Sequence, residues 1–174
     1  CLLWRTESGR HSSRGDFRDG LRFVRQSRTV VDEAYTLPLG KRSTYANRAN
    51  ELDLTFAKSA QVLHVVLRAY DDGVAFRYVL PGTGDVEITG EATTFPLASA
   101  DVAYWGQPHP NNYGYETPLG PVTADRISMP VLAELKDRML WLLVAQAASY
   151  GSYVIPNFAR QGNTLAVRFP MDQK

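Results

Sequence analysis

The densest group of residues with chemistry to offer lies near the middle of the chain, at residues 104–121. This stretch is rich in proline, glycine and asparagine, which predicts a long loop, and long loops in compact domains are often functional. Its aromatic rings can stack on sugar rings, and its amide and carboxylate oxygens can bind hydroxyl groups or a cation. A loop packed by its own aromatic side chains would have the same composition, so both interpretations stay open. The candidate sugar-binding residues are Trp105, Tyr113, Tyr115 and Asn112.

Carboxylates are a second source of chemistry, because hydrolysis of a glycosidic bond uses two of them on either side of the sugar. The sequence does not show any pair converging, and most of these residues are typical of turns or of a solvated surface. Glu116 differs from the others because it follows two asparagines and two tyrosines in the central loop. The carboxylates considered are Asp32, Glu33, Glu51, Asp71, Asp72, Glu87, Glu91, Glu116 and Glu134.

Other catalytic patterns are absent from the sequence. The histidines at 11, 64 and 109 lack the close spacing of a zinc site, and neither a phosphate-binding glycine loop nor a Gly-x-Ser-x-Gly nucleophile motif occurs. We interpret His64 as a residue packed within a strand, whereas His109, in the central loop, is kept as a minor candidate for contact with a ligand. These absences leave no sequence support for a metalloprotease, a nucleotide-binding enzyme or a serine hydrolase.

Composition also restricts the partners. Nineteen basic residues against eighteen acidic ones give a net charge of +1, which provides no reason to expect nucleic acid or an anionic membrane as a partner. No apolar run approaches the ~20 residues of a membrane span. The single cysteine, Cys1, excludes an intrachain disulfide.

The elements that position these residues are predicted to be strands. Residues 52–56 alternate strictly between apolar and polar types, and Asp71-Asp72-Gly73 joins two β-rich runs as a hairpin turn does. Helical periodicity is nearly absent. The sequence therefore predicts an all-β fold, an antiparallel sandwich or barrel. The expected strands lie at residues 52–56, 62–69, 74–80, 86–89, 93–97, 139–145 and 165–169.

The length of 174 residues suits one domain. Residues 1–20 are polar and lack periodicity, so we expect a poorly ordered terminus, with the sandwich domain at residues 21–174. The chain stops soon after a predicted strand, which we interpret as a cut through a longer protein.

Several segments resemble the N-terminal domain of glycoside hydrolase family 97. The most specific is Arg-Ala-Tyr-Asp-Asp-Gly-Val-Ala-Phe-Arg-Tyr at 68–78, and the likeness extends over about residues 21 to 170. Residues before Leu21 match poorly. The other matching segments are residues 31–43, 50–52, 90–95, 115–116 and 142–153.

This resemblance implies an antiparallel β-super-sandwich of the galactose-mutarotase-like type, followed in the same polypeptide by a catalytic (β/α)8 barrel. Family members are bacterial exo-acting α-glucosidases or α-galactosidases, usually exported, so the resemblance implies an α-linked oligosaccharide as substrate and a periplasmic or secreted location. Because the acid and the base or nucleophile lie on the barrel, we expect this chain alone to have no catalytic residues and no activity.

The resemblance also implies a calcium ion beside the sugar site. In the family pattern Leu-Leu-x-x-Glu-Ala-x-x-Tyr-Gly, a glutamate points toward the metal, and here Gln146 occupies that position. An amide oxygen can still bind calcium but supplies no charge, so either the metal is held more weakly or the alignment of the motif is shifted. Asn111 and Glu116 are the further metal candidates implied.

Two other functions stay open. The chain is a free-standing carbohydrate-binding module if Trp105 and the loop tyrosines bind sugar without any barrel. It is a structural interaction domain if it binds neither sugar nor calcium but docks onto a separately supplied barrel.

Overall fold

The computed structural model describes residues 2–3, 15–83, 90–97, 102–108, 117–119, 127–145 and 157–168. Most of this part of the chain is antiparallel strand, and its one helical element is the short 3-10 turn Lys136–Arg138, so the all-β prediction is confirmed. No helix in it is long and apolar enough to cross a membrane. The chain divides into two compact units, residues 6–86 and residues 1–5 with 87–174, each of which is described by itself.

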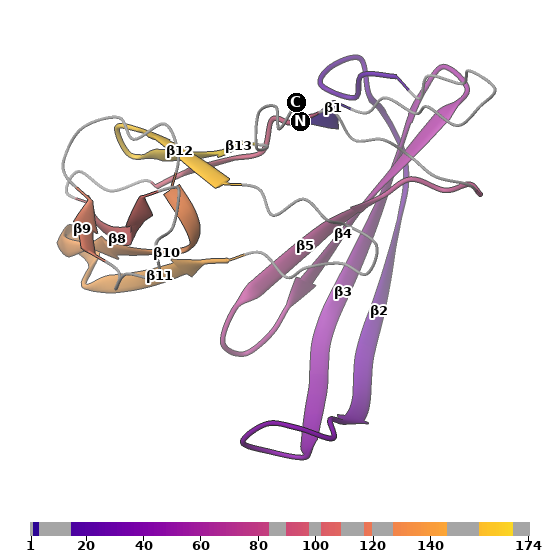
Figure 1. The fold of residues 1–174 in the computed structure, drawn as a ribbon. Helices are drawn as coiled ribbons and strands as arrows, with labels where there is room; N and C mark the ends of the chain where they lie inside the picture. The colour runs from indigo at the N-terminus through magenta and orange to yellow at the C-terminus, as the bar shows by residue number, and fades with distance from the viewer. Residues whose placement is uncertain are drawn as a thin grey trace. The chain divides into compact units, whose positions relative to one another are not determined.

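The first unit is a four-stranded antiparallel meander (Figure 1). The predicted hairpin around Asp71-Asp72-Gly73 is confirmed, and the turn is closed by a hydrogen bond from the Tyr70 amide to the Gly73 carbonyl. The alternation at residues 52–56 belongs to a longer strand. The four strands, in order across the sheet, are β2 (Arg22–Thr36), β3 (Thr44–Lys58), β4 (Gln61–Ala69) and β5 (Val74–Val79).

The register gives this sheet one apolar and one polar face, since directly paired residues share a face and neighbours along a strand alternate. Leu52, Leu54 and Phe56 of β3 pair with Leu67, Val65 and Leu63 of β4. On the other face, Glu51 pairs with Arg68 and Thr55 with His64. Alternation along β3 and β4 therefore places the ionisable groups on one face, where they share it with the aliphatic residues Val62 and Val66.

Residues 15–20, which the sequence assigns to a poorly ordered terminus, are attached to this meander. The Phe17 side chain is buried, with only 2% of its surface exposed, and it lines a pocket of about 210 Å³ beside Gln61 and Leu80. The Lys58 ammonium group donates to the carbonyl oxygen of Asp16 at 2.6 Å. A single apolar residue, Phe17, anchors this otherwise polar segment. One residue produces no hydrophobic periodicity, so the sequence pattern did not predict the attachment.

The second unit holds a seven-stranded sheet and a two-stranded one made by β1 and β6 (Figure 1). The seven-stranded sheet runs in the order β7-β13-β12-β10-β8-β9, and β11 also pairs with β10. The strands expected at 93–97, 139–145 and 165–169 are confirmed as β7, β11 and β13, whereas the strand expected at 86–89 lies outside the described residues. The strands are β1 (Leu2–Leu3), β6 (Gly90–Glu91), β7 (Thr94–Pro96), β8 (Val102–Pro108), β9 (Thr117–Leu119), β10 (Ile127–Leu135), β11 (Leu140–Val144), β12 (Asn157–Gln161) and β13 (Thr164–Arg168).

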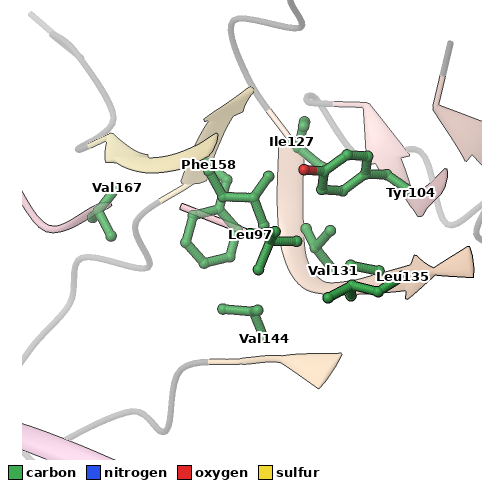
Figure 2. Packing of buried hydrophobic residues seen from close by; sticks show 10 residues of the cluster. Leu97, Tyr104, Ile127, Val131, Leu135, Val144, Phe158 and Val167 are labelled. Atoms are coloured by element: carbon green, nitrogen blue, oxygen red, sulfur yellow. The ribbon is translucent and has the colours of Figure 1, made fainter. Parts of the chain in front are cut away.

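Strand β10 organises this unit. It pairs with β8 along one side, while its other side pairs with β12 at Ile127 and with β11 from Val131 onward. A register shift falls between Ser128 and Leu132, around Pro130, which has no amide hydrogen to donate to the ladder. A single strand thus serves three neighbours and brings their apolar faces around one core (Figure 2). The core residues are Leu97, Tyr104, Ile127, Val131, Ala133, Leu135, Val144, Phe158, Leu165 and Val167.

The central region corrects one expectation. Residues 104–121 were expected to form one long loop, but β8 continues to Pro108 and β9 covers Thr117–Leu119. Tyr104 is a core residue with 1% of its surface exposed, and Gly106 is also buried. Alternation from Val102 through Tyr104 and Gly106 toward the core overrides the local turn-forming composition.

Candidate functional site

Trp105 is the only one of the predicted sugar-binding residues within the described part of the chain. It is partly buried in β8, and its indole lies against that of Trp141 in β11, with ring centroids 5.2 Å apart and planes inclined by 35°. The two tryptophans come from strands on opposite sides of β10, so their rings reach toward each other across that strand.

The register defines what surrounds this aromatic pair. Leu132 of β10 pairs with both Trp105 and Leu143, while Glu134 pairs with Trp141. These five residues therefore share one face of the sheet, opposite the face that carries Tyr104 and the core. Trp141 has 53% of its surface exposed, and Leu143 has 61%. We call this surface the tryptophan face: Trp105, Leu132, Glu134, Trp141 and Leu143.

The other candidate residues lie outside the described residues. They comprise the sugar-binding candidates Asn112, Tyr113 and Tyr115, and the metal candidates Asn111, Glu116 and Gln146. Their roles stay predictions, and so does that of His109.

The metal candidates can be assessed by their donor chemistry. Two amides and one carboxylate supply only oxygen, which fits the preference of calcium for six to eight oxygen ligands. Three side chains cannot fill six to eight positions, so several ligands would have to come from elsewhere, and the three candidates together supply one negative charge. Within the described ranges, no three His, Cys, Asp or Glu side chains gather closely enough to hold a metal ion.

The polar face of the meander carries ion pairs. His64 Nδ1 lies 2.9 Å from Asp53 Oδ1, and since a carboxylate only accepts, the nitrogen donates. Arg68 Nε donates to Glu51 Oε2 at 2.6 Å. This hydrogen bond is the main reason why the pKa of the Arg68 guanidinium is raised, and a hydrogen bond with Tyr70 is the second. His64 is thus packed within a strand, as the sequence predicts. Glu51 and Asp53 are thus each paired with a basic side chain of β4, Arg68 and His64 respectively.

A hollow of about 150 Å³ adjoins these pairs on the β4–β5 hairpin, within the segment that resembles family 97 most specifically. Arg68 and Arg77 line it, so it offers guanidinium donors, one of which already binds Glu51. Its full lining is Val66, Arg68, Tyr70, Ala75, Phe76 and Arg77.

A buried cation lies in the core of the second unit. Arg160 of β12 has 6% of its surface exposed, and its guanidinium carbon lies 4.0 Å from the centroid of the Tyr104 ring. Arg160 Nε also donates to the Gly162 carbonyl at 3.0 Å. Burial raises the pKa of the Tyr104 phenol, and the nearby guanidinium offsets part of that increase. The Arg160 guanidinium thus packs against the aromatic ring that β8 contributes to the core.

Sequence reasoning missed Trp141 and Arg160. The strand predicted at residues 139–145 places Trp141 and Leu143 on one face, because residues two apart in a strand point the same way, but pairing Trp141 with Trp105 requires the register of three strands. Arg160 follows Asn-Phe-Ala in a stretch that gave no strand signal, and no local pattern marks an arginine as buried.

Comparison with known proteins identifies the family. A family model described as "Glycosyl-hydrolase 97 N-terminal" matches residues 6–171 and so begins upstream of residue 21. A probable retaining alpha-galactosidase of Streptomyces bingchenggensis is 32% identical over 140 residues, which cover 79% of this chain and 22% of that protein.

Solved structures agree with this family match. A β-arabinopyranosidase matches with a TM-score of 0.78 and 25% identity, over 99% of this chain and 30% of that chain. A glycoside hydrolase family 97 enzyme from Pseudoalteromonas sp., in complex with acarbose, matches with a TM-score of 0.72 and 24% identity, over 96% of this chain and 26% of that one. The expected β-sandwich class is therefore confirmed, and the chain spans less than a third of the length of these relatives. This chain belongs to the glycosyl-hydrolase 97 N-terminal family and corresponds to one domain of larger glycoside hydrolases.

Proposed function

We propose that this chain is the non-catalytic N-terminal domain of an exo-acting α-glycosidase, either an α-glucosidase or an α-galactosidase. The acid and the base or nucleophile would lie in a (β/α)8 barrel of the same polypeptide, and the enzyme would be exported to the periplasm or secreted by a bacterium. The observation that carries the proposal is the N-terminal family match over residues 6–171, in a chain that spans 22% of a curated α-galactosidase.

In this proposal the domain shapes one wall of the sugar pocket. Trp105, Tyr113, Tyr115 and Asn112 are the residues assigned to that wall. Asn111, Glu116 and Gln146 would contribute oxygen ligands to a calcium ion, which would polarise reacting groups and help to hold the substrate.

The test uses the longer polypeptide with and without this domain, assayed on aryl α-glucosides and α-galactosides. We expect deletion of residues 1–174 to abolish turnover, because the pocket loses one wall and part of its metal site. A deletion variant that keeps its fold by circular dichroism and retains wild-type kcat/KM would refute the role. Calcium titration of the intact polypeptide and of Gln146→Ala tests the metal assignment by affinity rather than by activity.

A free-standing carbohydrate-binding module is the alternative, and the exposed Trp141 indole supports it. Calorimetric titration of the 174-residue chain with maltose and melibiose, together with hydrolysis assays on the longer polypeptide, separates the two. If the chain is a free-standing module, it binds sugar in the calorimeter, and removing it from the longer polypeptide does not change the rate of hydrolysis.

A further inference from the structure

We propose that the tryptophan face binds one ring of an α-linked oligosaccharide, with Trp141 as the stacking surface and Glu134 as the acceptor for sugar hydroxyl groups. The inference deepens the proposed function, on which it rests for the substrate class. It names a ligand surface that includes two residues, Trp141 and Glu134, that the sequence had not assigned to sugar binding.

The aromatic surface is available and supported. Trp141 has 53% of its surface exposed, so much of the side chain can be covered by a ligand. Trp105 is partly buried, and its ring lies 5.2 Å from that of Trp141. A ring buttressed in this way loses little side-chain freedom when a ligand stacks on it, which lowers the entropic cost of binding. The C–H face of a pyranose is apolar and flat enough to cover an indole.

Glu134 supplies the polar part of the surface. It lies directly opposite Trp141 in the β10–β11 register and on the same face, since paired residues share a face. Residues directly opposite in antiparallel strands have Cβ atoms about 4.5–5.5 Å apart. A sugar stacked on Trp141 therefore has a carboxylate within reach of its ring hydroxyls, and hydrogen bonds to a charged acceptor are stronger than neutral ones.

The same carboxylate argues against an apolar protein surface as the occupant. Leu143 and Trp141 alone would suit hydrophobic docking, because both are more than half exposed. An apolar partner would also cover Glu134 and leave its charge without hydrogen-bond partners, which carries a desolvation penalty. Sugar hydroxyl groups satisfy the carboxylate while the ring covers the indole, so a carbohydrate fits the mixed surface better.

The test is a titration of the 174-residue chain with maltotriose, followed by calorimetry and tryptophan fluorescence. We expect saturable binding with a Kd of about 1 mM, which is typical of a few contacts to a single site. Trp141→Ala should weaken binding at least about tenfold, whereas Trp141→Phe keeps a ring and should lose less. Glu134→Gln, which keeps the acceptor oxygen but not the charge, should weaken binding by a smaller factor.

Leu140→Ala is the matched control, because Leu140 lies on the same strand and has a similar exposed fraction, 51%, but is on the opposite face, outside the tryptophan face. It should leave the affinity for maltotriose unchanged. The proposal is overturned by absence of binding up to tens of millimolar sugar, by unchanged affinity in Trp141→Ala, or by equal losses in the alanine variants of Trp141 and Leu140. An unchanged urea midpoint of Trp141→Phe shows that its effect is not a folding defect. None of these results bears on the domain-deletion assay, so the proposed function can fail or hold independently.

Discussion

Replacing Arg160 by leucine removes a guanidinium group that lies 4.0 Å from the centroid of the Tyr104 ring. The change has two opposing effects on the free energy of unfolding. It deletes a cation–π contact and the hydrogen bond to the Gly162 carbonyl, but it also relieves the cost of burying a charge. The single replacement therefore does not measure the contact, and a double-mutant cycle with Tyr104 is required.

The burial of both side chains sets the magnitude of the coupling. Arg160 and Tyr104 have 6% and 1% of their surfaces exposed, so the contact is almost fully desolvated. A desolvated cation–π contact stabilises by about 2 kcal/mol, against about 0.5–1 kcal/mol at an exposed site. We expect the cycle built from Arg160→Leu and Tyr104→Leu to give a coupling free energy of about 2 kcal/mol.

The assay is equilibrium urea unfolding of the wild type, the two single variants and the double variant, followed by circular dichroism. A parallel cycle with Tyr104→Phe is the matched control, because phenylalanine keeps the ring beneath the guanidinium. Its coupling should stay below about 0.5 kcal/mol. A coupling below about 0.5 kcal/mol in the leucine cycle as well would show that the Arg160–Tyr104 contact contributes nothing to stability.

Three further predictions concern stability. Burial raises the pKa of Tyr104 above its ordinary value of 10.0, so the folded state holds the phenol proton more tightly than the unfolded state. The contribution of Tyr104 to the free energy of unfolding should therefore be complete below pH 10 and fall above it, by up to about 1.4 kcal/mol per pH unit until the folded-state pKa is passed. In urea titrations at increasing pH, Tyr104→Phe should lose the part of this decrease that comes from the Tyr104 phenol. Glu51→Gln weakens a partly buried ion pair with Arg68 and should cost about 1–2 kcal/mol, less in 1 M salt; equal losses at both salt concentrations would contradict an ionic origin. Gly162→Ala should cost about 1–2 kcal/mol in thermal melts, because φ is +57° although no atom lies within 4 Å of the added Cβ, and an unchanged melting temperature would exclude strain at that turn.

The fold was predictable where alternation and turn chemistry agree. The β4–β5 hairpin carries both signals, with β-rich runs on either side of Asp-Asp-Gly, and its strands fall within one residue of the prediction. Strand β2 was not predicted in full, because most of its residues on both faces are polar or exposed, which leaves little period-2 contrast. Residues 104–108 of β8 were predicted as loop, since proline and glycine counts outweighed the alternation of Val102, Tyr104 and Gly106 toward the core.

The candidate site was predictable only in part. Local composition is enough to single out Trp105 as an aromatic candidate, and the structure shows its ring against that of Trp141. It could not identify that neighbour, since the contact depends on which strands flank β10. The placement of Asn112, Tyr113 and Tyr115, and of the three metal candidates, is still a prediction from composition and resemblance.

The central claim is that the groups that break the glycosidic bond lie outside this chain. The most direct measurement is the turnover of p-nitrophenyl α-glucoside and α-galactoside by the purified 174-residue chain, with added calcium and a heat-inactivated control. The account predicts release of nitrophenol no faster than in the control. Turnover above the control that disappears when one of this chain's own carboxylates is replaced by its amide would contradict it.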